Sequence, residues 1–496
     1  MKSLSLGSAG AALALAIYAV LLVRANSSIA GGADSSGYLN EARLLARGRL
    51  SEEIAALALL GLPSRDHDLF LPLGYRSGPR PGTMASSYPP GLPLHMAALG
   101  ILGGWGAAPF LAAPIAAIAA LLLIYAVARE LGVSRGFSAA GALVLAACPI
   151  LFGLAVQPMS DVPATAWVLA AVYFGLRARR SDGWAAAAGA ALGIAVLVRP
   201  TNALAVIPLL FALPPGWRAL VRAFAGGVLF AAFLLLYNHA AFGSATSTGY
   251  ETILTRTMSA ANVLPEIRHH GFWLGVLLTP LVPLAWIGVG FDRRVPARDR
   301  ALLLTWFGAF FAFYCFYEVY DDWWAVRFLL PGIPAMILAA LLVARDVPLP
   351  MKWKKVVGPA LLAGIVAVGV IHVAKFGILS IGRGERVYRD ASRGAVSLVP
   401  TQSLIAAMQM SGALKYYVER PSLRSDRVRP ERFAEIRRRA EERGIPMYAL
   451  LWPFEVADLD HMPGDWEPIG RWRDVTLYRL REMGSGLHLP HGGLSP

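Results

Sequence analysis

The chain has 496 residues, of which 56% are hydrophobic and 16% are charged. With a mean hydropathy of +0.52, this composition excludes an ordinary soluble protein and makes the lipid bilayer the expected solvent. The formal net charge of +14 does not indicate nucleic-acid binding, because the basic residues lie largely in short loops between apolar segments. Cys148 and Cys315 both lie inside apolar segments, which argues against a disulfide framework and against a thiolate metal site.

Apolar segments that are long enough to cross a bilayer, or nearly so, recur from residue 7 to residue 375. We predict eleven transmembrane helices, and the first is an uncleaved anchor because its apolar stretch is longer than that of a signal peptide. The predicted spans are residues 7–23, 107–128, 137–156, 162–178, 184–198, 201–213, 218–237, 271–290, 301–319, 327–344 and 356–375. The apolar segment 91–104 is short for a span, so we expect it to be interfacial or re-entrant.

The composition becomes mixed and charged after the last predicted span. We therefore predict a membrane domain over residues 1–375, with a large outer loop at 25–106, and a C-terminal domain over residues 376–496. In the latter, strand-like runs at 403–407, 446–452 and 475–480 alternate with helix-like runs at 411–418 and 430–443. The expected fold class is a polytopic α-helical membrane protein with a small C-terminal α/β soluble domain.

Basic residues set the orientation of the predicted bundle. If segment 91–104 does not span, the short loops that are rich in arginine and lysine lie on the cytoplasmic side, as the positive-inside rule requires. The N-terminus is then cytoplasmic, whereas the loop 25–106 and the C-terminal domain are extracytoplasmic. We expect a multi-pass protein of the inner (plasma) membrane, with its chemistry at the outer face.

Two aspartates lie on that outer side, each where a loop meets a helix. Asp34 follows the first span, and Asp161 lies between the third and the fourth. Either can be explained as a helix N-cap, since aspartate is favoured there and Pro163 suits the first turn after Asp161. The alternative is a pair of catalytic carboxylates, with Asp34 as a base at the interface, where partial desolvation raises a carboxyl pKa. Their shared side of the membrane favours chemistry.

Two arginines at the outer ends of spans are candidates for binding phosphate. Arg199 lies where Pro200 breaks a helix, and an interfacial arginine is costly unless it has a function or extends to the headgroups. Arg327 follows a run of aspartates and tryptophans that includes Asp322. An aromatic belt explains the tryptophans, but it does not explain Asp322 or Arg327. The planar guanidinium group of Arg327 suits a lipid phosphate.

Other polar residues on the outer side are less specific signals of a functional site. Tyr38 lies at helical spacing on the segment after the first aspartate, and Tyr88 lies in a Ser-Tyr-Pro-Pro-Gly turn that needs no further explanation as a turn. Glu251 is expected on the same side. The adjacent histidines at 269 and 270 are a poor metal signal, because consecutive helical side chains point in different directions.

Six short motifs follow one another along the membrane domain. They are the outer-loop aspartate with a tyrosine and a helix ending in LLARGRL, the YPPGLPL turn, the span ending in ARELG, the SDVPA junction, the RPTN break and WAVRFLLPGIP. In this order they resemble the GT-C glycosyltransferases, in particular the bacterial relatives of protein O-mannosyltransferases and aminoarabinose transferases. The resemblance implies Asp34 as catalytic base, Asp161 as a second acidic residue of the site, and Arg199 and Arg327 as phosphate ligands. Ser35 follows Asp34 where the mannosyltransferase branch has a second acidic residue, which leaves the acceptor open.

The resemblance also implies a reaction. A sugar would move from a polyprenyl-phosphate carrier to an acceptor hydroxyl on a lipid, glycan or protein, with inversion. Tyr38, Tyr88, Glu251 and Asp322 are the further residues expected to bind substrate. The partners are thus the lipid-linked donor, an unidentified acceptor and the membrane lipids, and not nucleic acid. No cofactor is assigned, no metal ligands are named, and a divalent metal is left open.

Two other functions compete with this interpretation. A transporter or flippase of envelope glycolipids would also be polytopic with charged residues in broken helices, but such proteins commonly show internal repeats and polar sites near the midplane. A non-catalytic envelope assembly factor would use the C-terminal domain to bind a partner. Carboxylates of Asp34 and Asp161 that meet within about 10 Å would favour the enzyme, since that is the span over which two carboxylates share one substrate.

Overall fold

A computed structural model describes residues 6–249, 257–318, 322–347 and 350–481. The chain divides into two compact units. The membrane unit comprises residues 1–53 and 74–386, and the C-terminal unit comprises residues 54–73 and 387–496. The predicted division after residue 375 differs from this one, because the C-terminal unit begins about ten residues later and includes a segment of the predicted outer loop.

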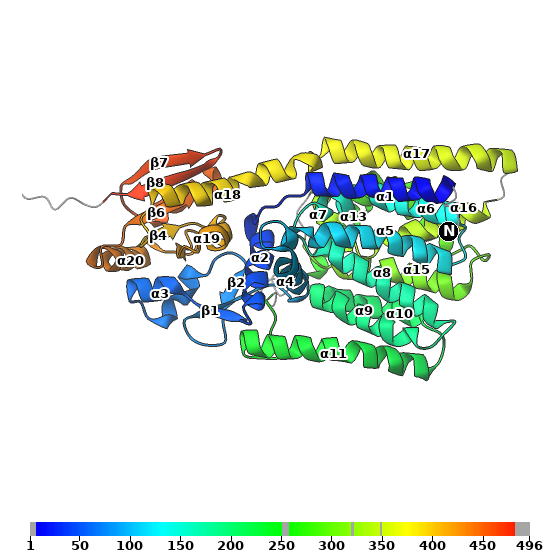
Figure 1. Ribbon diagram of the computed structural model, residues 1–496, viewed down its shortest axis with the longest axis horizontal. Coiled ribbons are helices and arrows are strands. Elements are labelled where there is room, and N and C mark those ends of the chain that lie inside the picture. The colour runs from blue at the N-terminus through cyan, green and yellow to red at the C-terminus, as the bar shows by residue number, and fades with distance from the viewer. Residues whose placement is uncertain (1–5, 250–256, 319–321, 348–349, 482–496) are drawn as a thin grey trace, which may run out of the picture. The chain divides into compact units, whose positions relative to one another are not determined.

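The membrane unit is mostly helical, and its elements follow the apolar segments of the sequence (Figure 1). Its α-helices are α1 Leu6–Ala25, α2 Gly32–Ala46, α4 Gly91–Gly103, α5 Ala112–Glu130, α6 Arg135–Ala147, α7 Pro149–Ala155, α8 Asp161–Ala178, α9 Trp184–Val198, α10 Val206–Ala212, α11 Trp217–Phe242, α13 Val263–Leu278, α14 Leu281–Val289, α15 Ala297–Tyr314, α16 Ile333–Asp346 and α17 Met351–Lys375. Its 3-10 helices are η2 Ala108–Leu111, η3 Pro200–Ala205, η4 Ala260–Asn262, η5 Trp323–Leu329 and η6 Ile378–Ser380. Helix α18, Ile381–Leu398, runs across the boundary between the units.

Each predicted span falls on a helix or on a pair of helices, but the count of eleven is not confirmed. By length and composition, three helices of the described chain can cross a membrane, namely Ala108–Glu130, Trp217–Phe242 and Val356–Lys375, or up to six if each bent pair is one span. The bent pairs are α6 with α7, α13 with α14, and η5 with α16, at 63°, 111° and 83°. Proline explains two of these bends, because Pro149 and Pro280 stand at the breaks and disfavour helical backbone in the preceding residue.

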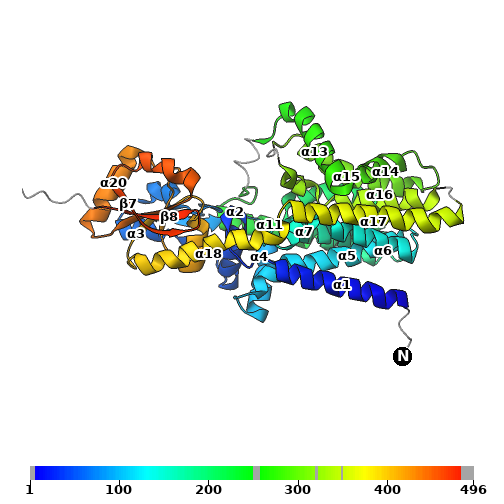
Figure 2. The same cartoon turned by 90° about the horizontal axis from the view of Figure 1, so that it is seen from above.

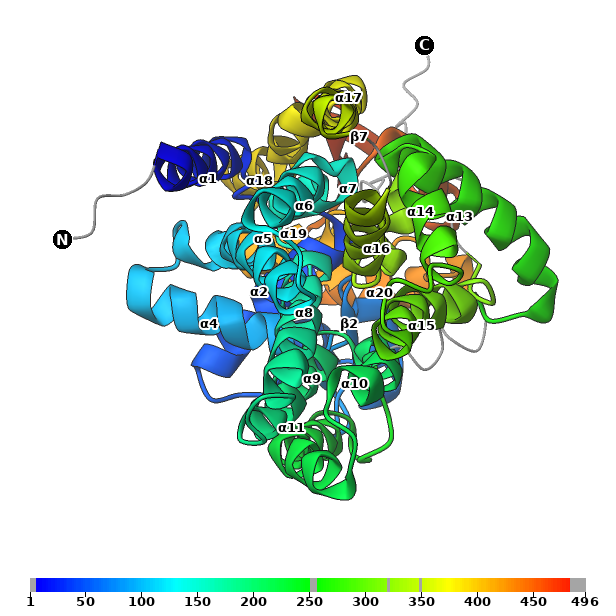
Figure 3. The ribbon, with the colours of Figure 1, turned by 90° about the vertical axis from the view of Figure 1, so that its right-hand side faces the viewer.

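Helix α8 lies in the middle of the bundle, between α5 and α9. Most of its residues are buried, and many are alanine or another small residue, which allows neighbouring helices to approach closely. Helix α1 runs along α5 in Figures 1 and 2. In Figure 3, which looks along the bundle, α4 is seen from the side and so lies across the other helices. The segment predicted to be interfacial therefore forms a 13-residue helix transverse to the bundle.

The outer loop between α2 and α4 contains a small antiparallel sheet. Its strands are β1 Ser51–Glu53, β2 Tyr75–Ser77 and β3 Thr83–Ser86, in the order β1-β3-β2. All four residues of β3 are buried, and the strand leads directly into the turn that carries Tyr88. This sheet was not predicted, because its strands are three or four residues long and show little alternation of polar and apolar residues.

The C-terminal unit is built on a five-stranded sheet of order β5-β4-β6-β8-β7. The strands are β4 Leu404–Ala406, β5 Ser422–Leu423, β6 Met447–Leu451, β7 Trp466–Trp472 and β8 Val475–Leu480, and the helical elements are α3 Ala55–Leu60, η1 Ser64–Phe70, α19 Ser411–Val418, α20 Pro430–Glu442 and η7 Pro453–His461. Strand β4 pairs in parallel with β5 and β6, whereas β8 pairs antiparallel with β6 and β7. The predicted C-terminal sheet is thus present, although β5 and β7 were missed.

Residues 54–73 belong to the C-terminal unit because its arginines bind their backbone. The amide of Arg424 donates to Leu69 O over 2.7 Å, and its guanidinium donates to Leu71 O over 3.3 Å. Arg432 forms an ion pair with Asp66. These contacts join segments more than 350 residues apart, so hydropathy along the sequence could not predict them.

At Gly91, helix α4 packs against the end of α9. A Cβ atom at this position would lie within 3.0 Å of backbone atoms of Leu197 and Val198, at the end of α9. Backbone cannot move aside as a flexible side chain can, so we expect Gly91→Ala to destabilise the protein by about 1–3 kcal/mol. Thermal unfolding in detergent micelles measures this. Gly275→Ala in α13 is the matched control, since its Cβ would meet nothing within 4 Å, and equal melting temperatures for the two variants would contradict the packing.

Candidate active site

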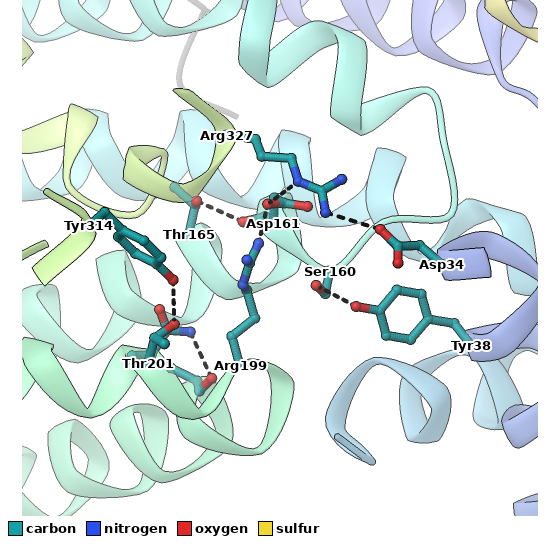
Figure 4. Close-up of polar contacts among 11 residues, drawn as sticks. Asp34, Tyr38, Ser160, Asp161, Thr165, Arg199, Thr201, Tyr314 and Arg327 are labelled. Carbon is teal, nitrogen blue, oxygen red and sulfur yellow. Dashed lines mark hydrogen bonds and ion pairs between the residues drawn. The ribbon is translucent and has the colours of Figure 1, made fainter. Parts of the chain in front are cut away.

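Asp34 lies in the first turn of α2, but it is not the N-cap of that helix. The N-cap is Gly31, and Asp34 is the third helical residue. Its carboxylate instead faces two partners from distant parts of the chain. The Tyr88 hydroxyl donates to Oδ1 over 2.9 Å. Arg327 Nη2 donates to Oδ2 over 3.0 Å, as Figure 4 shows. The side chain remains 34% exposed.

The charge state of Asp34 follows from these partners. Burial raises the pKa of Asp34, but the Arg327 guanidinium, the Tyr88 hydroxyl and the more distant Arg199 outweigh burial. The net effect places the pKa of Asp34 below its usual value. The prediction of a pKa raised by desolvation is therefore wrong for this conformation, because a cation lies within hydrogen-bonding distance. Asp34 is an ionised carboxylate at neutral pH.

Asp161 opens α8 and is almost completely buried, with 1% of its surface exposed. Arg199 donates to its Oδ1, and Arg327 Nε lies 4.0 Å from the same oxygen. Two guanidinium groups therefore converge on one carboxylate, as Figure 4 shows. Asp161 holds two cations close together that would otherwise repel one another.

The aromatic ring of Phe328 lies against the same two arginines. The guanidinium carbon of Arg199 is 5.3 Å from its centroid, and that of Arg327 is 5.2 Å away. Tyr314 stacks on this ring at 5.2 Å and donates from its hydroxyl to Thr201 over 2.9 Å. These are cation–π distances, and they restrict both guanidinium groups to one orientation. Nothing in the sequence pattern singled out Phe328.

Both predicted carboxylates contact the one guanidinium group of Arg327, which comes from η5. They are therefore within the distance of about 10 Å that favours a shared substrate. Asp34 comes from α2, Asp161 from α8 and Arg199 from the end of α9, where the extended backbone at −147°, 115° precedes Pro200. Four of the predicted site residues thus meet at one place.

Tyr38 and Tyr88 complete this site. Their rings pack at 4.4 Å, and the Tyr38 hydroxyl donates to Ser160 Oγ over 2.9 Å. The Tyr88 ring occupies space left by two glycines, since a Cβ on Gly37 or on Gly74 would lie within 3.0 Å of it. Tyr88 is therefore more than a turn residue. Gly37 in the middle of α2 was the available signal, because an interior helical glycine usually has a packing reason.

Asp322 and Glu251 are the other two predicted site residues. The Asp322 carboxylate accepts a hydrogen bond from the amide of Trp323 over 2.6 Å and so caps η5, the element that carries Arg327. Glu251 lies outside the described residues. Within the described parts of the chain, no three His, Cys, Asp or Glu side chains gather as a metal site would require. Substrate contact by Asp322 stays a prediction.

The ion pair between Arg327 and Asp34 can be measured by a double-mutant cycle. Arg327→Met removes the cation from a carboxylate that is one third exposed, so we expect a coupling free energy of about 1–2 kcal/mol with Asp34→Asn. Denaturant titration in detergent gives the free energy of unfolding. Because the pKa of Asp34 is lowered, the coupling is present at neutral pH and is lost as the pH falls below 3.8.

The exposed pair Arg222 and Asp182 is the control for this cycle. Its atoms are 3.0 Å apart, but the side chains are 48% and 49% exposed. We expect a coupling of at most about 1 kcal/mol, since water and salt screen such pairs. If both cycles gave the same coupling, the central pair would contribute no more than an exposed pair does.

Comparisons with known proteins bear on this arrangement. A family model described as "Dolichyl-phosphate-mannose-protein mannosyltransferase" matches residues 88–242. No curated protein matches the chain. Among solved structures, ArnT from Cupriavidus metallidurans bound to undecaprenyl phosphate is similar with a TM-score of 0.62 and 16% sequence identity, over 94% of this chain and 97% of that one. The same protein in the apo state has a TM-score of 0.58 at 16% identity, over 94% and 96% of the two chains.

A second protein is similar over part of its length. The arabinofuranosyltransferase AftD from Mycobacteria has a TM-score of 0.53 at 14% identity, over 97% of this chain and 42% of that one. The apolar helices and the fold shared with these neighbours indicate a membrane protein. Which membrane it occupies, and which side each terminus faces, stay predictions. The chain thus has the fold of the GT-C glycosyltransferases, and the family resemblance inferred from its motifs is confirmed.

Proposed function

We propose that the chain is a glycosyltransferase that moves a sugar from a polyprenyl-phosphate carrier to an acceptor hydroxyl at the outer face of the cytoplasmic membrane. The observation that carries this proposal is the Arg327 guanidinium shared by Asp34 and Asp161, with Arg199 beside it. Paired arginines next to an ionised carboxylate on a partly exposed side chain suit a reaction in which a phosphate leaves while a hydroxyl loses its proton. The structural neighbour ArnT, bound to undecaprenyl phosphate, supports a lipid phosphate as the leaving group.

Asp34 acts as the general base. The acceptor oxygen attacks the anomeric carbon, the bond from that carbon to the phosphate oxygen breaks, and the electron pair stays with the phosphate. The acceptor proton passes to Asp34. A donor phosphate that draws Arg327 toward itself weakens the ion pair with Asp34 and so raises the pKa of that carboxyl, as a base requires. Binding of the donor thereby activates the base.

Arg199 and Arg327 hold the donor phosphate. Each guanidinium side chain is 15% exposed, and each is fixed by Asp161 and the ring of Phe328. Donors that are already oriented stabilise the negative charge on the leaving phosphate without a further cost of reorganisation. With 1% of its surface exposed, Asp161 acts by orienting both arginines.

The competing transporter interpretation is less well supported. The two carboxylates meet at one guanidinium group, close enough to share a substrate, as the enzyme requires. The acceptor is not identified, because lipid, glycan and protein hydroxyls all present the same nucleophile. Tyr38 and Tyr88 lie next to Asp34 and are the side chains we assign to the sugar or the acceptor.

Asp34→Asn tests the base. An amide cannot take up the acceptor proton, so we expect sugar transfer to fall about 10²–10⁴-fold with the protein still folded. Transfer is measured from polyprenyl-phosphate sugars to a panel of lipid, glycan and peptide acceptors. Asp182→Asn, at an exposed pair, is the matched control and should retain full activity. Undiminished transfer by Asp34→Asn would remove this residue from the mechanism.

Arg199→Gln tests the phosphate site. We expect the affinity for undecaprenyl phosphate to fall about tenfold or more, because one charge-assisted hydrogen bond is lost. Asp161→Asn should weaken the same binding, since Arg199 and Arg327 lose the carboxylate that orients them. Binding is followed by thermal shift with the lipid in detergent. Arg222→Gln is the control, and equal affinity in all variants would place the phosphate elsewhere.

A further inference from the structure

Helix α2 carries a second carboxyl group on the face that bears Asp34. Glu41 follows Asp34 by seven residues and Tyr38 by three, so the three side chains share one side of the helix. Unlike Asp34, Glu41 is buried, with 2% of its surface exposed. It plays no part in the reaction proposed above.

Two hydroxyl groups hold the Glu41 carboxyl in place. Ser86 Oγ of β3 donates to Oε2 over 2.7 Å, and the Tyr237 hydroxyl of α11 donates to Oε1 over 2.7 Å. Each oxygen atom therefore has a partner from a different element. The carboxyl group joins α2 to the outer-loop sheet on one side and to a long apolar helix on the other.

The same contacts lead to the base. The amide of Tyr88 donates to Ser86 Oγ over 3.3 Å, and the hydroxyl of Tyr88 donates to Asp34. Ser86 thus connects Glu41 with the residue that orients the Asp34 carboxylate. A displacement of α2 relative to β3 would change both ends of this connection together.

The surroundings of Glu41 favour its neutral form. Burial raises its pKa to about 8, although the hydrogen bonds from Tyr237 and Ser86 lower it. Tyr75 of β2 interacts electrostatically with Glu41, and also with Glu52 and Arg43. In the neutral form, which a pKa of about 8 favours at neutral pH, one of the two contacts reverses its direction, so that the carboxyl group donates to one hydroxyl and accepts from the other at the same oxygen–oxygen distances.

We propose that Glu41, as a neutral carboxylic acid, is a positioning residue that fixes α2 against β3 and α11 and so holds Asp34 and Tyr88 in their working geometry. Its effect on the reaction rests on the proposed function. When Glu41 loses its proton, a charge is buried with only two hydroxyl groups to compensate for its lost hydration, and this cost weakens the packing of α2 against β3 and α11. The site is then assembled below about pH 8 and disturbed above it.

The experiment compares Glu41→Gln and Glu41→Ala with the wild type. Sugar transfer is followed from about pH 6 to about pH 9.5. Glutamine donates and accepts as the carboxylic acid does, so we expect Glu41→Gln to stay within about twofold of wild type at neutral pH and to lack the loss above about pH 8. Glu41→Ala should lose about tenfold or more at every pH. A wild-type loss that persists in Glu41→Gln, or a Glu41→Gln as impaired as Glu41→Ala, overturns the proposal.

A second readout does not depend on transfer. Infrared spectra at neutral pH should show the C=O band of a protonated carboxyl group in the wild type, and Glu41→Gln should lack it. Because the folded pKa is raised from 4.5 to about 8, the wild type should also lose thermal stability relative to Glu41→Gln as the pH rises between these values. If no variant transfers sugar, the proposed function fails. In that case the neutral state of Glu41 is refuted separately if the band and the pH-dependent change in stability are both absent.

Discussion

The site depends on one cation shared between two anions. Arg327 reaches Asp34 on α2 and Asp161 on α8, and so joins three segments that are far apart in the sequence. A guanidinium group removed from water is tolerated when such partners compensate for its lost hydration. Because removal of either aspartate would leave part of that charge uncompensated, the helices that carry them are held at a fixed separation. The geometry of the candidate site and the packing of the bundle therefore depend on the same ion pairs.

Broken helices supply the side chains at this point. Arg199 extends from the end of α9 because Pro200 ends the helix, Arg327 comes from the bent pair of η5 and α16, and Asp161 begins α8. If these helices were unbroken, the same side chains would lie at different heights along the bundle and would not meet. Irregular backbone at membrane depth is tolerated where protein surrounds it. The same breaks leave several helices shorter than a span, and α8 and α15 are long enough but carry charged residues near their ends, so the predicted number of spans is not confirmed.

Features that depend on residues close together in the sequence could be predicted, whereas features that depend on contacts between distant residues could not. Apolar runs located the bundle helices, and the resemblance to GT-C glycosyltransferases assigned Asp34, Asp161, Arg199 and Arg327 to one predicted site. Hydropathy could not assign residues 54–73 to the C-terminal unit, because their contacts with Arg424 and Arg432 join segments that are far apart in the sequence. Likewise, the lowered pKa of Asp34 needs a cation from 293 residues away.

Helix α2 illustrates why chemistry follows surroundings rather than residue type. Asp34 and Glu41 carry the same functional group, about 10 Å apart along one helix. The cation Arg327 and the Tyr88 hydroxyl keep the first ionised, whereas burial keeps the second neutral despite its two hydroxyl partners. Carboxyl groups whose surroundings separate their pKa values take different roles. Because the helix between them is rigid, the neutral group can anchor the charged one without touching the substrate. Under the proposed function, an anchor without charge also adds no competing anion to a site that binds phosphate.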